Sequence, residues 1–269
     1  MLKTLYEHWP EYLMEAAGLG LFMVSAGLFG ILLFHPASPV VQLLPGELSR
    51  RALMGVAMGA TAVAIIYSPW GQQSGAHLNP SVTLTFLCLG KVAPWDALFY
   101  ILAQFAGGMA GVLAVLALTG ELFAAPPISY VATMPGKYGE GIAFLAEIGI
   151  TFVLMTVVLV TTNRRRLSRF TGVFAGLLVA AYITFEAPVS GMSMNPARSF
   201  ASAFPGRLWH GLWIYFTAPP LGMVLAAGVY QVFRRGREVV CAKLNHHTHR
   251  RCIFRHCGFG KMMAGGEDE

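Results

Sequence analysis

The sequence predicts an all-α membrane protein: a bundle of six transmembrane helices and two re-entrant half-helices, arranged as an inverted repeat. Composition gives the first indication, since 55% of the 269 residues are hydrophobic and 12% are charged. A soluble domain usually carries about 25% charged residues. The second is a series of long apolar windows. The third is a pair of related segments that interrupt the apolar sequence, "SGAHLNPSVTL" and "SGMSMNPARSF".

Six charge-poor windows are each long enough to cross a bilayer. A hydrocarbon core of about 30 Å requires about 20 residues of helix, and no part of the chain shows the alternation of a membrane β-barrel. We expect the first window to be a retained span, because it has no small-residue cleavage pattern of a signal peptide. The windows are residues 12–34, 52–70, 95–118, 141–162, 170–188 and 209–233.

The distribution of charge gives the orientation. With six spans both termini lie on one side, and 14 of the 19 Lys and Arg residues fall on that side. The positive-inside rule then places both termini in the cytoplasm, although Arg50 and Arg51 beside the second span oppose this orientation. The net charge of +6 is explained by topology, so we expect a multi-pass protein of the cell membrane, surrounded by lipid bilayer, and no nucleic-acid partner.

The two halves of the chain are related. Aligning Asn79-Pro80 with Asn195-Pro196 also brings Glu15 into register with Glu147. Each half then contains two spans, an Asn-Pro segment and a third span. Because three is an odd number, the second copy must enter the membrane in the opposite sense. We place the connecting loop, residues 119–140, outside the cell.

The Asn-Pro pairs predict helix starts inside the membrane. Asn is a preferred N-cap and Pro is favoured at the first helical position. About ten residues follow each Asn, enough for a helix of about 15 Å, half a bilayer. The irregular backbone before each Asn is tolerated only against protein or a water-filled cavity. Two facing helix N-termini, each partly positive, predict a narrow path that hydrogen-bonds neutral solutes and repels cations and protons.

The central constriction is predicted from the two symmetric boxes, Asn79, Pro80, Ser81 and Asn195, Pro196, Ala197. Arg198 follows in the first turn of the second half-helix. Its membrane position suits a group that donates to solutes and excludes cations. The alternative is a structural lock for the outer loop.

Four further polar residues are predicted to support the re-entrant loops. Glu15 and Glu147 are expected to accept hydrogen bonds from loop amides, and a proton relay is the alternative. His77 is expected to support its loop, with pH sensing as the alternative. Gln104, on the third span, is expected to bind the same loop.

These motifs, together with "LWIYFTAPPLG", resemble those of the aquaporin, or major intrinsic protein, family over about residues 10–235, and the pattern is bacterial-like. The resemblance implies a right-handed bundle, a pore through each subunit and a homotetramer. Two Asn-Pro-Ala boxes are typical of that family. Ser81 departs from the Ala of the first box, and this small residue should be tolerated.

The resemblance also implies a four-position outer filter. Strict water channels usually carry His where this chain has Ile183, which favours channels for glycerol, metalloid hydroxides or similar solutes. Ser199, Ala203 and Tyr215-Phe216 instead resemble the water branch. Methionine side chains are flexible, so the width of the filter stays open. The four positions are Met58 or Gly59, Ile183, Met192 and Arg198.

The sequence therefore predicts a passive channel for water, with or without other small neutral solutes. The first alternative is a facilitator for glycerol or metalloid solutes. An inverted-repeat secondary transporter is a second, but it would need a charged site at the midplane. An intramembrane enzyme is not expected, because the spans contain no nucleophile–base pair or metal-ligand cluster. No cofactor is predicted.

The channel domain is predicted over residues 1–238, with repeat halves at about 10–118 and 141–233, and a basic tail follows over 239–269. The Cys and His spacing in the tail fits no standard short zinc knuckle, and a reducing compartment disfavours disulfides. A solvated or lipid-surface tail without metal is favoured, with metal or redox sensing as the alternative. The weak candidate ligands are Cys241, Cys252 and Cys257.

Overall fold

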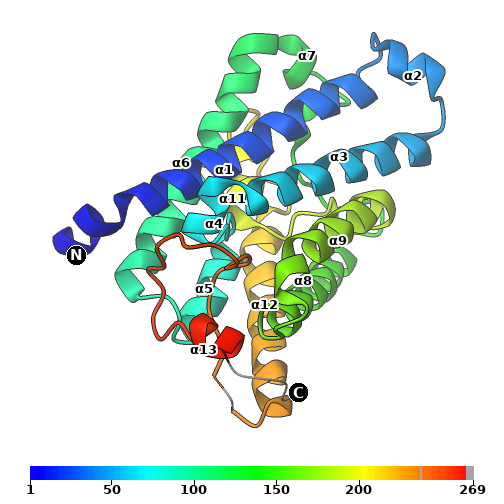
Figure 1. Cartoon of the computed structure of the whole chain (residues 1–269). Coiled ribbons are helices and arrows are strands. Elements are labelled where there is room, and N and C mark those ends of the chain that lie inside the picture. Colours follow the sequence, from blue (N-terminus) through cyan, green and yellow to red (C-terminus); the bar gives the residue numbers. More distant parts are fainter. Residues whose placement is uncertain (237, 265–269) are drawn as a thin grey trace.

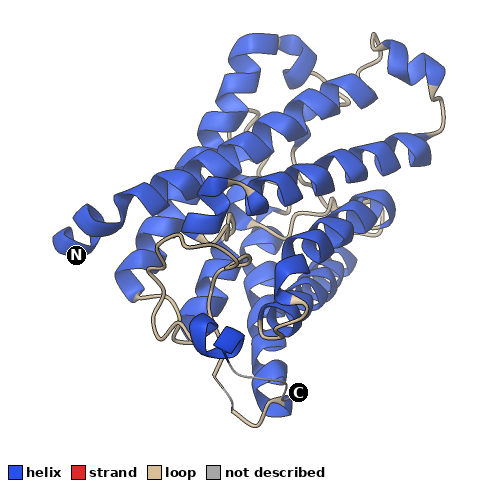
Figure 2. Ribbon diagram, viewed as in Figure 1, coloured by secondary structure: helices blue, strands red, loops and turns tan. Residues whose placement is uncertain are grey.

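Six long helices form the body of the molecule in the computed structural model, which describes residues 1–236 and 238–264 (Figure 1). All six are long and apolar enough to cross a membrane. Regular structure in the described residues is helical (Figure 2). The long helices are α1 Leu2–Phe34, α3 Glu47–Tyr67, α6 Pro94–Thr119, α8 Glu140–Thr162, α9 Thr171–Phe185 and α12 Leu212–Phe233.

Each long helix overlaps a predicted span, and the differences lie at the ends. Helix α3 begins five residues before and ends three residues before the predicted window of 52–70, and α12 begins three residues after the start of the window 209–233. Helix α1 begins ten residues before the predicted window of 12–34, and its polar first turns extend beyond the apolar part. The predicted fifth span, 170–188, is shorter as a helix, because α9 ends at Phe185 and a separate short helix follows. The final residues of the predicted tail, 265–269, lie outside the described residues.

Short helices occupy the connections between the long ones, and one more, α13, lies in the tail after α12. Two of them, α5 and α11, are the predicted half-helices and have 9 and 8 residues. The set comprises α2 Pro39–Leu43, α4 Pro69–Ser74, α5 Pro80–Cys88, α7 Glu121–Ala124, η1 Ser129–Val131, η2 Ser168–Phe170, α10 Ala187–Ser190, α11 Pro196–Ala203 and α13 Phe259–Ala264.

The packing of the helices follows the repeat. Helix α1 packs along α6 in the first half, α8 packs along α12 in the second half, and α3 packs along α9 between the halves. The N-terminus and helix α13 lie on one face, here called the terminal face, and α2 and α7 lie on the opposite face (Figure 1). Each half-helix packs against both α6 and α12.

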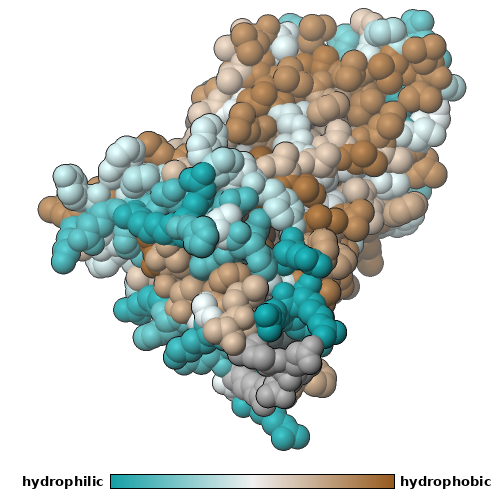
Figure 3. Space-filling view, in the orientation of Figure 1, coloured by the Kyte–Doolittle hydropathy of each residue, from teal (hydrophilic) through white to brown (hydrophobic). Residues whose placement is uncertain are grey.

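The outer surface is apolar where the helices run. Large side chains such as Leu102, Leu177 and Leu225 are more than half exposed. Figure 3 shows hydrophobic residues covering the upper part of the view, and hydrophilic residues gathered near the terminal face. Exposed apolar area of this extent is stable in lipid and not in water. The chain is therefore a multi-pass membrane protein.

Glycine allows the closest helix packing. A Cβ atom on Gly107 of α6 would lie 2.0 Å from the Ala16 carbonyl oxygen of α1, and one on Gly111 would lie 2.3 Å from the Gly20 carbonyl oxygen. Small residues at such contacts let two membrane helices approach closely enough for their backbones to touch.

We expect Gly107→Ala to destabilise the protein by about 1–3 kcal/mol, the usual cost of overpacking. The added methyl group can be accommodated only if α1 and α6 separate. Thermal unfolding in detergent, followed by fluorescence-detected gel filtration, measures the shift. Gly228→Ala on α12 is the control, because its Cβ would meet nothing within 4 Å. Equal midpoints for the two variants would contradict this account of the packing.

Candidate functional site

Both Asn-Pro pairs begin helices, as their capping chemistry predicts. Asn79 precedes α5, and its Oδ1 accepts a hydrogen bond from the Ser81 amide at 2.8 Å. Asn195 precedes α11, and its Oδ1 accepts from the amides of Ala197 at 3.0 Å and Arg198 at 3.2 Å. The two side chains satisfy amides that the first turn of a helix leaves unpaired.

The two asparagines also bind the opposite loop reciprocally. The Asn79 Nδ2 donates to the Met194 carbonyl at 2.7 Å, and the Asn195 Nδ2 donates to the Leu78 carbonyl at 2.7 Å. Each contact joins residues more than a hundred positions apart, so the two half-helix starts meet in the middle of the bundle. A side-chain amide carries two hydrogens, and each of these bonds uses one.

A cavity of about 430 Å³ runs past this meeting point. Both asparagines line it, but the other members of the two boxes do not. Ser81 and Ala197 are fully buried, and Pro80 and Pro196 are the first residues of their helices. The Ser81 hydroxyl is buried without a hydrogen-bond partner among the described residues, and Ser81 is not a lining residue of the cavity.

Predicted filter residues lie together along the same cavity. Met58, Ile183, Met192 and Arg198 all line it. Gly59 does not: a Cβ atom there would lie 2.5 Å from the Gly176 carbonyl oxygen of α9. The structure therefore assigns the cavity position to Met58 and the helix contact to Gly59.

The carboxylate of Glu15 holds the first re-entrant loop. Its Oε1 accepts from the Ser74 hydroxyl at 2.8 Å and the His77 amide at 3.0 Å. Its Oε2 accepts from the Leu78 amide at 2.6 Å and the Gln104 side chain at 2.9 Å. Glu15 is fully buried, so these four donors replace the water that a buried carboxylate would otherwise need.

Glu147 holds the second loop in the same way. It is fully buried and accepts from the Ser190 hydroxyl at 2.8 Å, the Ser193 amide at 2.7 Å and the Met194 amide at 2.8 Å. Neither carboxylate lines the cavity. The geometry favours the supporting role over a proton relay.

These hydrogen bonds hold a strained backbone. Ala76, Leu78, Met192 and Met194 have φ values of 54°, 51°, 50° and 55°. Such values cost a residue with a side chain about 1–3 kcal/mol and persist only where the surroundings enforce them. The alternating conformation lets the glutamates bind successive amides, while the carbonyls of Leu78 and Met194 receive the asparagine amides.

His77 has a partner on each ring nitrogen. Nδ1 lies 3.1 Å from the Thr83 hydroxyl and Nε2 lies 2.9 Å from the Ala242 carbonyl. The ring stacks between Phe86 and Phe254, with both centroid distances at 5.3 Å. His77 thus supports its loop and is also covered by the C-terminal tail.

Arg198 faces the cavity and also binds the outer loop. It lines the cavity and donates to the Thr133 hydroxyl in the loop after η1. That hydroxyl is also 2.9 Å from the Ser199 hydroxyl. The sequence does not predict Thr133 as a partner of Arg198, because no motif in the surrounding loop distinguishes this residue.

The tail corrects the expectation of a solvated or lipid-surface segment. Cys241, Ala242 and Leu244 are buried, and the Leu244 amide donates to the Gly75 carbonyl at 3.1 Å. Leu244 also lines the cavity. Burial lowers the pKa of the Lys243 ammonium. The tail lies over the cavity at the terminal face, and it brings the predicted weak metal ligands together with His246.

Comparisons with known proteins agree with this geometry. The Major intrinsic protein family matches residues 5–230. "Aquaporin NIP2-3" from Zea mays is 37% identical over 229 residues, covering 84% of this chain and 73% of that protein. "Probable aquaporin NIP-type" from Nicotiana alata is 36% identical over 184 residues, covering 66% of this chain. The match spans 64% of the Nicotiana protein's own length, just under two thirds.

Similarity to a solved structure supports the fold. The aquaglyceroporin from Plasmodium falciparum aligns with a TM-score of 0.68 at 20% identity, covering 83% of this chain and 95% of that one. Major intrinsic proteins are channels and not enzymes. From the family match, the paired half-helices and the six spans, we conclude that this chain belongs to the major intrinsic protein family.

Proposed function

We propose that the chain is a passive channel that conducts water and small uncharged solutes and excludes ions and protons. The observation that supports this most is the reciprocal pair of asparagines on the cavity wall, each with a second amide hydrogen. A solute oxygen accepts these hydrogens as it passes. The N-termini of α5 and α11 add positive potential at the same point, and Arg198 adds a full positive charge.

The membrane location, the orientation and the oligomeric state are part of the same proposal. We place the protein in the cell membrane with both termini in the cytoplasm, because the positive-inside rule favours this orientation. The family resemblance supports a homotetramer in which each subunit has its own pore. The terminal face and its tail would then face the cytoplasm.

The cavity wall disfavours an ion-coupled transporter. Such a protein requires a charged site at the midplane to bind the coupling ion. Here the carboxylates of Glu15 and Glu147 are already bound to amides of the loops that precede the two asparagines. The groups offered to a solute at that level are amides.

A second candidate is a facilitator for glycerol, metalloid hydroxides or related solutes. Three of the four filter side chains, Met58, Ile183 and Met192, are apolar. An apolar filter with a single guanidinium suits solutes that have a carbon face and hydroxyl groups. Such a filter offers few hydrogen-bonding groups, and so it is less suited to a channel for water alone.

Stopped-flow light scattering on proteoliposomes tests both candidates. We expect an osmotic gradient of an impermeant sugar to shrink these vesicles much faster than protein-free vesicles, with a low activation energy. A glycerol or urea gradient distinguishes the candidates, because re-swelling after shrinkage reports solute entry. Shrinkage no faster than that of protein-free vesicles would contradict the channel proposal, and fast shrinkage without re-swelling would exclude the second candidate.

A further inference from the structure

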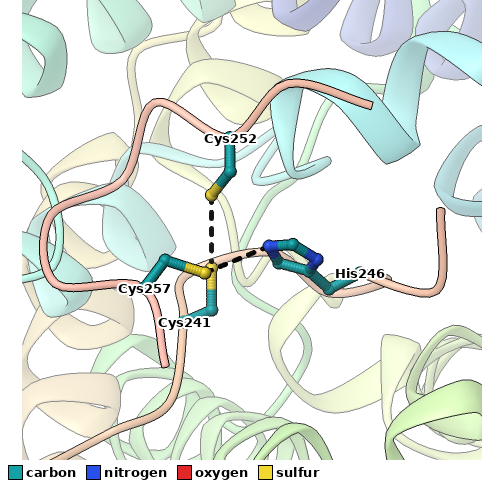
Figure 4. Close-up of side chains that lie close together, drawn as sticks. All are labelled: Cys241, His246, Cys252 and Cys257. Carbon is teal, nitrogen blue, oxygen red and sulfur yellow. Dashed lines mark hydrogen bonds between the residues drawn. The ribbon is translucent and has the colours of Figure 1, made fainter. Parts of the chain in front are cut away.

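Four side chains of the tail converge on one point. They are Cys241, His246, Cys252 and Cys257, and their ligand atoms all lie within 4.8 Å of one another. Figure 4 shows the three sulfurs and the imidazole directed toward the space between them. The Cys241 and Cys252 sulfurs are 3.6 Å apart, and the Cys257 sulfur is 3.2 Å from His246 Nε2.

These distances are close to those of a tetrahedral metal site. Zinc binds thiolate at about 2.3 Å and imidazole at about 2.0–2.1 Å. Tetrahedral angles then place neighbouring ligand atoms about 3.5–3.8 Å apart. Three thiolates with one imidazole form a donor set used by structural zinc sites, and soft sulfur ligands select against magnesium and calcium. A disulfide would use only two of the four groups.

Contacts within the protein help to position the ligands. Cys241 is buried. The His246 ring stacks on Phe259 of α13 with centroids 4.4 Å apart and planes 15° from parallel. Residues 238–258 form no helix or strand, so this segment has little regular structure of its own to fix its shape. Metal binding supplies folding free energy to such segments.

The tail segment that carries the ligands is attached around the terminal end of the cavity. Its contacts reach α1, both ends of the first re-entrant segment and the loop after α8. With Leu244 on the cavity wall, this segment forms a cap at the terminal end of the cavity. The contacts are Arg251 Nη2 to Glu11 Oε2 at 2.6 Å, Leu244 N to Gly75 O at 3.1 Å, Arg255 N to Lys91 O at 2.8 Å and Val240 N to Asn163 Oδ1 at 2.6 Å.

The side chain of Leu244 brings this cap into contact with the cavity. It lies between Cys241 and His246 in the sequence and lines the cavity that contains Asn79 and Asn195. The two ligands that flank it therefore restrain its position, together with the bond from its amide to the Gly75 carbonyl. A change in the metal site would act on Leu244 through the short stretches of backbone on either side.

We propose that Cys241, His246, Cys252 and Cys257 bind one zinc-type ion, and that the bound ion holds Leu244 in the terminal mouth of the cavity. Metal occupancy then controls permeability: the loaded tail narrows the mouth, and removal of the ion releases it. The metal site stands by itself, whereas the control of flux rests on the channel function proposed above.

Metal content tests the site without any transport measurement. The full chain is purified under reducing conditions with a tag that contains no histidine, stripped with a chelator, reloaded with zinc and desalted. Mass spectrometry of the metal should find about one zinc per chain. Cobalt in place of zinc should give the intense visible bands of a tetrahedral thiolate site.

Variants assign the ligands. Cys252→Ser and Cys257→Ser should lose the zinc, and His246→Ala should lose most of it. Cys88→Ser and His249→Ala are the matched controls, because Cys88 and His249 are exposed and lie outside the cluster. Failure of the wild-type chain to take up zinc, or equal zinc in Cys252→Ser and Cys88→Ser, would overturn the site.

Proteoliposomes test the control of flux. A membrane-permeant chelator should raise the osmotic water permeability of zinc-loaded vesicles several-fold, and added zinc should reverse the increase. Leu244→Ala should retain its zinc and show the higher permeability even when loaded. Equal permeability of loaded and stripped protein would overturn the gate. Absence of water flux in every form would overturn the channel function, and the zinc content would still decide the metal site.

Discussion

Replacing Glu147 with alanine is expected to abolish the folded channel. The carboxylate accepts from the Ser193 and Met194 amides and the Ser190 hydroxyl, and no water from the bilayer can replace it. Each buried donor left unpaired costs about 1–3 kcal/mol. Two amides and a hydroxyl together approach the total stability of about 5–15 kcal/mol of a typical protein.

Fluorescence-detected gel filtration in detergent, with and without heating, measures this loss. We expect Glu147→Ala to elute as aggregate or at greatly reduced yield. Glu147→Gln should fall between this variant and wild type, because it keeps one acceptor oxygen but brings an amide group toward amide donors. Glu121→Ala, at an exposed glutamate on α7, should behave as wild type. A monodisperse Glu147→Ala protein of unchanged midpoint would contradict the supporting role.

Replacing Arg198 with alanine is expected to change what the channel transmits more than how fast it transmits water. The guanidinium lines the cavity and is the full positive charge beside the two helix N-termini. Its removal widens the cavity and lowers the electrostatic barrier to cations. We expect faster glycerol and urea entry and a measurable proton leak, recorded with a pH-sensitive dye inside proteoliposomes.

Two further variants separate charge from shape. Arg198→Lys keeps the positive charge but loses the planar fork, so it should exclude cations while admitting larger solutes than wild type. Arg207→Ala removes an exposed arginine and should change neither property. If Arg198→Ala keeps wild-type solute exclusion and proton tightness, Arg198 serves only to hold the loop through Thr133.

The bundle and its half-helices could be predicted from the sequence because the membrane allows a chain few types of structure. Hydrocarbon demands about 20 apolar residues per span and permits irregular backbone only inside protein. Asn79 and Asn195 predict helix starts because an N-cap side chain bonds amides only two or three residues further along the chain. Glu15 and Glu147 could be paired because the repeat places them at equivalent positions.

Other parts of the site depend on contacts that spacing does not reveal. Met58 and Gly59 are neighbours about 100° apart on one helix. An uncertainty of one residue in the filter position therefore decides between a residue on the cavity wall and a residue in a helix contact. The tail reaches His77 through a contact between residues 165 positions apart. Its Cys and His residues follow no standard zinc-knuckle spacing, and only folding shows that they converge.

The left-handed backbone at Ala76, Leu78, Met192 and Met194 has a consequence for evolution. Because main-chain carbonyls of Leu78 and Met194 position the two asparagines, a side chain in these loops can change without removing those contacts, provided that the new residue tolerates the left-handed backbone. Selection on solute range can therefore act at Met192, while Glu15 and Glu147 keep the scaffold folded. Substrate preference and foldability are inherited through different residues, so members of such a family can diverge in what they carry while retaining one architecture.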